Sequence, residues 1–145
     1  LSLAAYLWVV TPISLPNIVS FLGSFMKMNV SNSGISKMMI RLSEILQPVY
    51  KEIREEVKSG CHVWADETGW RIRGQLHWLW AFANTRTAYY HVDKSRGSPV
   101  VEYVLGTIFY GILITDAWGA YSKIVSSKQT CMAHIFRKIR KFLRN

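Results

Sequence analysis

Two acidic residues follow apolar runs in similar settings and could together bind a divalent cation. Asp66 follows the run at residues 63–65, and Asp116 follows the run at residues 111–115. Apolar runs of this kind, bounded by turn residues, are typical of buried strands. An unpaired carboxylate is costly to bury, and hard cations prefer carboxylate oxygens. Two strand-end acids at one edge of a sheet would therefore make a metal site. Alternatively, each Asp merely opens a polar turn, where Asp is common.

Zinc is a second metal that the sequence could bind. Cys131 and His134 have the spacing of half a zinc site, and Cys61 with His62 could supply the other half. Neighbouring residues on a strand point to opposite faces, so Cys61 and His62 would not easily share one metal. We therefore do not expect zinc, and interpret His134 as a structural histidine. Two cysteines are too few for a disulfide framework and fit a reducing cytoplasm.

The charge of the chain favours a polyanionic partner. Its 18 Lys and Arg residues exceed its 9 Asp and Glu residues, giving a formal net charge of +9. Nucleic acid is the first candidate for such a chain and an anionic membrane the second. Residues 1–26 are uncharged, but prolines and polar residues interrupt them and no basic start precedes them. These features predict neither a membrane span nor a signal peptide.

Positive charge is concentrated near the C-terminal end, where residues 117–145 contain no acid. A basic helix is predicted from residue 134 or 135 onward. Its cations are expected to contact DNA phosphates, which is a sequence-independent interaction; they include Arg137, Lys138, Arg140 and Lys141. The alternative is a solvated helix end, where the macrodipole favours cations.

Helical periodicity dominates residues 1–59, which we predict to form a helical segment. One helix is expected from Ser14 and a second from residue 33 or 34. Two short helices across a tight turn can form a helix-turn-helix, whose second helix would present Lys37 and Arg41 to DNA. An ordinary helical hairpin is the alternative. Residues 50–58 are highly charged and predict a solvated linker helix, and a domain boundary follows near residue 60.

Residues 60–145 alternate between strand and helix patterns. Trp78 and Trp80 share one strand face and are expected in the core rather than as base-stacking platforms. The order β-β-β-α-β-α-β-α predicts an α/β fold with a mixed sheet. The expected strands are 61–66, 75–84, 87–93, 111–116 and 129–133, with a turn at Arg73-Gly74 and helices at 98–105, at 120–125 and from residue 134 or 135.

This order, with one acid ending the first strand and another ending the fourth, resembles the ribonuclease-H-like fold of DDE transposases and integrases. Several residue stretches are most similar to those of the insertion-sequence-sixty-six transposases, and the resemblance covers most of residues 14–141. The matching stretches are residues 65–68, 76–80, 95–97, 105–106, 111–116, 120–121, 131–134 and 137–138.

The resemblance implies DNA transposition by phosphoryl transfer, without a covalent protein intermediate. Asp66 and Asp116 match the first two acids of the family's catalytic triad, which would hold two Mg²⁺ (or Mn²⁺) ions. Transposon-end DNA is the implied partner, and a homo-oligomer the implied state at full length. Glu67 follows Asp66 directly, so it should point away from the metal and have a supporting or structural role.

The third acid of the family has no counterpart in this sequence. It is a Glu on a helix beyond the stretch at residues 131–134, and Glu102 precedes Asp116 and cannot replace it. We therefore expect a truncated ribonuclease-H-like core that is inactive alone, with a two-metal site only where the missing acid is supplied. One alternative is a non-catalytic DNA-binding remnant. Another is a ribonuclease-H-type nuclease, which also needs additional acids.

Overall fold

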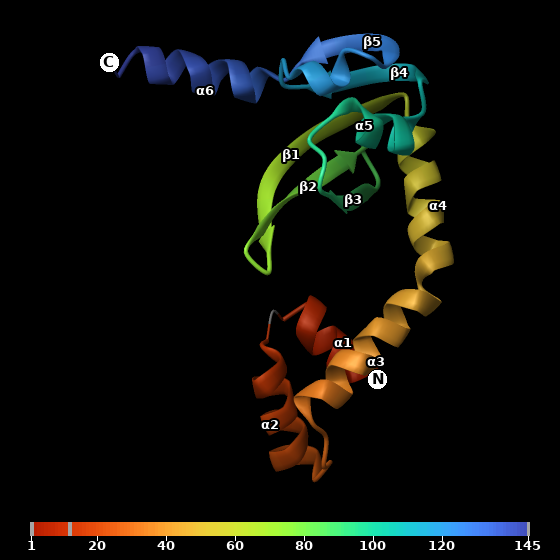
Figure 1. Ribbon diagram of the computed structural model, residues 1–145, viewed down its shortest axis with the longest axis vertical. Helices are drawn as coiled ribbons and strands as arrows, with labels where there is room; N and C mark the ends of the chain where they lie inside the picture. The colour runs from red at the N-terminus through yellow and green to blue at the C-terminus, as the bar shows by residue number, and fades with distance from the viewer. Residues whose placement is uncertain (1, 12, 145) are drawn as a thin grey trace. The chain divides into compact units, whose positions relative to one another are not determined.

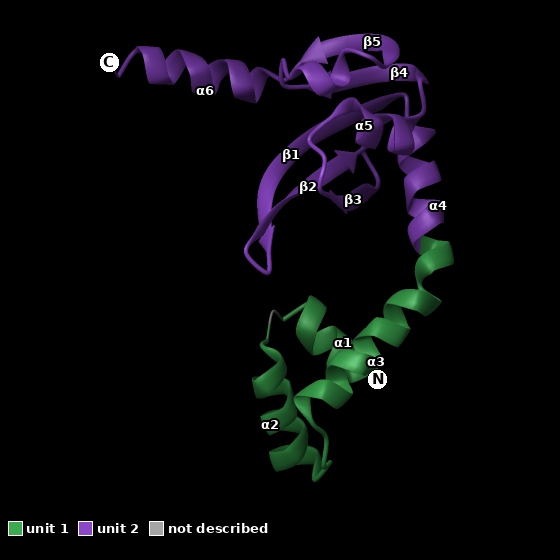
Figure 2. Ribbon diagram, viewed as in Figure 1, with its two compact units in different colours: residues 1–49 green, residues 50–145 purple. Residues whose placement is uncertain are grey.

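The computed structural model describes residues 2–11 and 13–144, which divide into units of residues 1–49 and 50–145 (Figure 2). The first unit holds three helices, α1 (Ser2–Val9), α2 (Leu15–Met26) and α3 (Asn32–Ile45). Ser31 caps α3, because its side chain accepts a hydrogen bond from the Gly34 N–H at 3.1 Å. No helix in the described ranges is both long and apolar enough to cross a membrane.

Helix α4 (Gln47–Lys58) leads into the second unit and contributes to its core. The units divide between Val49 and Tyr50, ten residues before the predicted boundary near residue 60. The reason is that Val57 is fully buried, while Tyr50 and Ile53 pack against the same core. The prediction of a solvated linker helix is therefore wrong for the apolar face of α4.

The second unit is built on a five-stranded mixed sheet of order β3-β2-β1-β4-β5 (Figure 1). Strands β1, β2 and β3 pair antiparallel, whereas β4 pairs parallel with both β1 and β5. This topology confirms the predicted fold class, a ribonuclease-H-like α/β fold preceded by helices. The strands are β1 (His62–Ile72), β2 (Gln75–Ala83), β3 (Ala88–Asp93), β4 (Ile108–Thr115) and β5 (Val125–Thr130).

Strand β1 continues well beyond the acid that was expected to end it. It runs six residues past Asp66 and joins β2 through the turn at Arg73-Gly74, as predicted. Both turn residues have positive φ, 50° and 80°, which matches a type I′ hairpin turn. Asp66 therefore lies within a strand rather than at its end.

One face of the sheet is covered by α4, by α5 (Ser98–Leu105) and by the 3₁₀ turn η1 (Gly119–Tyr121). Trp80 is fully buried in this core and Trp78 packs at its margin, as predicted. Residues 120–125 were expected to be helical, but they form only the η1 turn followed by the start of β5. That strand accordingly begins earlier than the predicted range of 129–133, and α6 (Met132–Phe142) follows it.

Gly111 allows a close approach between β4 and the residue before β1. A Cβ at this position would lie 2.8 Å from the Cys61 carbonyl oxygen and 2.5 Å from Cζ of buried Phe109. The same carbonyl accepts the Ile112 N–H at 2.9 Å, so the backbone cannot move away without losing this bond. We expect Gly111→Ala to destabilise the protein by about 1–3 kcal/mol in urea unfolding.

Gly119→Ala is the matched control for this prediction, because nothing lies within 4 Å of a Cβ added at Gly119. Equal unfolding free energies for the two variants would contradict the steric account of Gly111.

Candidate functional site

The two predicted catalytic acids lie on β1 and directly after β4, at Asp66 and Asp116. The parallel pairing of these strands runs from His62 opposite Ile112 to Trp64 opposite Ile114. The same register, carried two residues further, places Asp66 opposite Asp116. Because side chains alternate along a strand, both acids fall on the sheet face of Trp64 and Ile114. The fold therefore brings the two acids to one edge of the parallel part of the sheet.

Each carboxylate is oriented by a backbone amide close to it in sequence. The Glu67 N–H donates to Oδ1 of Asp66 at 3.0 Å, and the Trp118 N–H donates to Oδ1 of Asp116 at 3.0 Å. The Asp66 side chain is 61% exposed, and its Oδ2 lies 3.8 Å from Nε2 of His134. In both acids these amides contact only Oδ1, so the second oxygen is not held by them.

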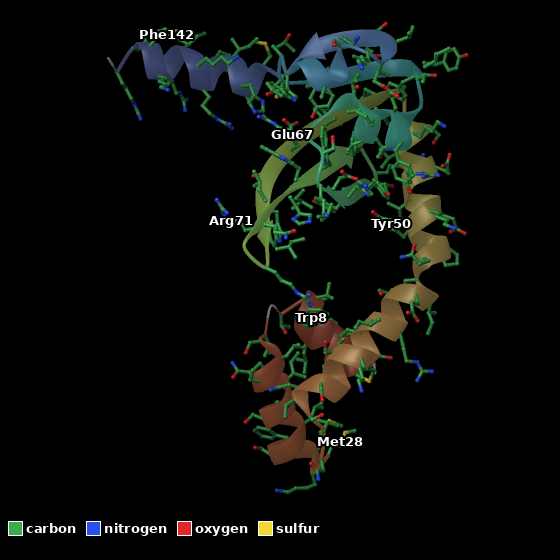
Figure 3. All side chains as sticks on the ribbon, viewed as in Figure 1. Trp8, Met28, Tyr50, Glu67, Arg71 and Phe142 are labelled. Atoms are coloured by element: carbon green, nitrogen blue, oxygen red, sulfur yellow. The ribbon has the colours of Figure 1, made fainter. Side chains whose placement is uncertain are left out.

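Glu67 points to the opposite, covered face of the sheet, and its side chain is only 1% exposed (Figure 3). Nη2 and Nε of Arg96 lie 2.9 and 3.0 Å from its Oε1, and the Tyr121 hydroxyl donates to its Oε2 at 2.6 Å. A buried carboxylate is tolerable only with such partners. Burial first, and the Glu67 hydrogen bond second, raise the pKa of Tyr121, so the hydroxyl stays protonated and donates. We call these three residues the Glu67 cluster.

Two tryptophans enclose the guanidinium group of Arg96. Its central carbon lies 4.5 Å from the ring centre of Trp78 and 4.2 Å from that of Trp118, both within cation–π range. The indole N–H of Trp118 also donates to the Arg96 carbonyl oxygen at 3.2 Å. Arg96 therefore connects Glu67 to the segment that follows Asp116.

Sequence reasoning did not select Arg96, Trp118 or Tyr121 as site residues. The only signal was that Arg96 and Tyr121 lie within stretches that carry the family resemblance. His134, interpreted as structural, lies close to Asp66 but forms no hydrogen bond with it at 3.8 Å.

The donor set suits a hard divalent cation only in part. Mg²⁺ takes one or two carboxylates and keeps water or phosphate for its other ligands, and Asp66 with Asp116 could provide those carboxylates. Within residues 2–11 and 13–144, no three His, Cys, Asp or Glu side chains gather to hold a metal. Cys61 and Cys131 are free thiols. The described residues therefore offer a two-carboxylate site that other ligands would have to complete.

The residues predicted to bind DNA are exposed on two separate helices. Lys37 and Arg41 are exposed on α3, one turn apart, whereas Ile35 and Met39 of that helix are buried. Helix α6 extends from the end of the sheet where β5 finishes, and no residue of it is buried (Figure 1). Its predicted DNA contacts are all exposed; they are Arg137, Lys138, Arg140 and Lys141.

Comparison with known proteins gives one family and two similar molecules. The model of the family described as "Transposase IS66 family" matches residues 3–145. The uncharacterized protein y4qI of Sinorhizobium fredii (strain NGR234) is 30% identical, over 75% of this chain and 25% of that protein. The chain thus spans about a quarter of the length of this relative. A chain in the cryo-electron microscopy structure of the simian T-cell lymphotropic virus intasome, in complex with PP2A regulatory subunit B56 gamma, is similar at 16% identity and a TM-score of 0.40. That match covers 48% of this chain and 31% of that chain.

Proposed function

The chain belongs to the IS66 family of transposases, and from this premise we propose that it supplies two of the carboxylates used for cleavage and transfer of DNA strands. The register of β1 against β4 supports the proposal, because Asp66 and Asp116 each lie two residues beyond the paired residues Trp64 and Ile114. In α/β sheets, ligands bind outside the carboxyl ends of the parallel strands. Asp116 directly follows β4, and Asp66 lies two residues beyond the last β1 residue that pairs with β4.

Asp66 and Asp116 are the residues that would hold Mg²⁺ or Mn²⁺. When bound, such an ion activates water or a DNA 3′-hydroxyl and stabilises the leaving oxygen. The protein's part is to orient the two carboxylates, to which the Glu67 and Trp118 amides contribute. Because the described residues bring no third acid to the pair, we expect the 145-residue chain to bind metal without cutting DNA.

DNA is the proposed partner, and α6 is the proposed binding surface for its phosphate backbone. The first turn of α6 carries His134, which lies beside Asp66, and the exposed cations follow along the same helix. A phosphate chain held by these cations would therefore pass the acid pair. Lys37 and Arg41 are proposed as further contacts from the helical segment 1–59. Recognition of transposon ends, assembly as a homo-oligomer and a cytoplasmic location belong to the same proposal.

A non-catalytic DNA-binding remnant is the second candidate function, and the lack of a third acid among the described residues favours it. The two candidates differ in metal binding. A remnant needs only the cations of α6 and α3, whereas the proposed enzyme core must also bind a divalent cation at Asp66 and Asp116.

Calorimetric titration of the chain with Mn²⁺ separates the two candidates. Asp66→Asn and Asp116→Asn each remove one negative ligand, so each is expected to weaken Mn²⁺ binding roughly tenfold or more. Glu52→Gln removes the same charge from an exposed position on α4 and is expected to leave the affinity unchanged. Mn²⁺ binding that neither Asp variant alters would contradict the proposed function.

A further inference from the structure

We propose that Glu67, Arg96 and Tyr121 are positioning residues, which fix the spacing of Asp66 and Asp116 from the covered side of the sheet. The expected effect of these residues on metal affinity rests on the proposed function. Their expected effect on the positions of the two acids does not depend on it. Glu67 itself cannot be a ligand at the acid pair, because its carboxylate faces the opposite side, where it accepts two hydrogen bonds and forms an ion pair with Arg96.

The cluster joins three parts of the fold that sequence separates widely. Glu67 lies on β1, and Tyr121 is the last residue of η1. Arg96 directly precedes Gly97, the N-cap of α5. A buried ion pair seldom adds net stability compared with apolar packing, and its best supported use is to specify one arrangement. The arrangement specified here is the placement of the segment 116–121 against β1.

The connection to Asp66 runs through one peptide unit. The N–H of Glu67 donates to Oδ1 of Asp66, so the orientation of this peptide helps to set the direction of the carboxylate. Arg96 and Tyr121 hold the Glu67 side chain at both of its oxygens. They thereby restrict the rotation of the peptide that orients Asp66.

The connection to Asp116 runs through Trp118. The Trp118 N–H donates to the Asp116 carboxylate, while its indole ring packs on the Arg96 guanidinium and donates to the Arg96 carbonyl oxygen. Tyr121 then fastens the end of the same segment to Glu67. The segment after Asp116 is therefore held to Glu67 near its start and at its end.

The test uses two mild changes in the 145-residue chain. Tyr121→Phe removes one hydroxyl but leaves the ring that packs against Trp80, and Arg96→Lys keeps the charge but loses the planar fork. Tyr50→Phe is a matched control, because its hydroxyl donates to the Tyr90 carbonyl oxygen at 2.6 Å, away from the acids.

Arg54→Lys is the matched control for the arginine change. Arg54 also bonds a carboxylate through Nε and Nη2, that of Glu55, and lies 4.9 Å from the Tyr103 ring centre. The readouts are amide hydrogen exchange at Glu67 and Trp118, measured by NMR, and Mn²⁺ affinity. Thermal unfolding of all four variants shows how much of any change is a general loss of stability.

Both cluster variants are expected to speed amide exchange at Trp118 roughly tenfold relative to their controls. The reason is that the Glu67 cluster would no longer hold the segment 116–121 against local opening. They are also expected to weaken Mn²⁺ binding several-fold at equal thermal stability, about the effect of losing a residue that orients a ligand. Exchange at Glu67 and Trp118 that matches the controls would overturn the proposal. If Asp66→Asn leaves Mn²⁺ binding unchanged, the proposed function fails, and exchange alone then decides whether the cluster positions the acids.

Discussion

Replacing the four predicted DNA contacts of α6 together by glutamine is expected to lower the affinity for duplex DNA roughly a hundredfold at low salt. All four side chains are exposed, and no acid occurs between residues 117 and 145 to neutralise them. Each phosphate contact adds about −0.9 to the slope of log affinity against log salt, so four contacts contribute about −3.6. The variant combines Arg137→Gln, Lys138→Gln, Arg140→Gln and Lys141→Gln.

Fluorescence anisotropy with a labelled duplex at several salt concentrations measures both the affinity and the slope. The control carries the same loss of four charges at exposed lysines elsewhere, through Lys51→Gln, Lys58→Gln, Lys94→Gln and Lys123→Gln. A control that loses as much affinity as the α6 variant would mean that net charge, and not the helix, binds DNA.

Arg96→Leu is expected to destabilise the second unit by about 3–5 kcal/mol, because it leaves a buried carboxylate without its cation. The Glu67 side chain is 1% exposed, and only the Tyr121 hydroxyl would remain as a donor. Arg54→Leu is the control, since Glu55 is 57% exposed and water can replace the lost partner. That surface change is expected to cost about 0–1 kcal/mol.

Urea unfolding of the single and double variants measures the coupling directly. Adding Glu67→Gln to Arg96→Leu is expected to recover part of the loss, because the unpaired charge is removed as well. If the two changes simply add, the carboxylate of Glu67 does not depend on Arg96 for its burial.

The alternation of apolar and polar residues along the sequence was sufficient to predict most of the sheet. Alternating residues located β2 and β3, and Arg73-Gly74 identified the turn, because a type I′ turn favours glycine. Strand β5 was displaced in the prediction, since its polar sequence at the sheet edge has no apolar alternation. Residues 120–125 were predicted to be helical, yet Ala120, Tyr121 and Ile124 are buried around a single 3₁₀ turn.

The sequence predicted individual residues of the candidate site, but not the contacts between residues that are distant in sequence. Asp66 and Asp116 were predicted because an unpaired carboxylate is costly to bury and because both match acids of the family's triad, but their common register depends on how β1 and β4 pair. The partnership of Glu67 with Arg96 joins residues 29 positions apart. No local pattern in one sequence predicts such a contact. On α4 the apolar pair Ile53 and Val57 was visible among the charges, but its burial depends on the sheet that it packs against.

Anomalous X-ray scattering from crystals of the chain soaked in Mn²⁺ would test the central claim most directly, because it locates the ion itself. We expect a peak bound by carboxylate oxygens of both Asp66 and Asp116, at about 2.0–2.3 Å from them, as for hard cations on oxygen ligands. The peak should be absent in Asp116→Asn crystals soaked in the same way. Mn²⁺ found only at other carboxylates, with Asp66 and Asp116 empty, would contradict the assignment of these two acids as the metal-binding pair.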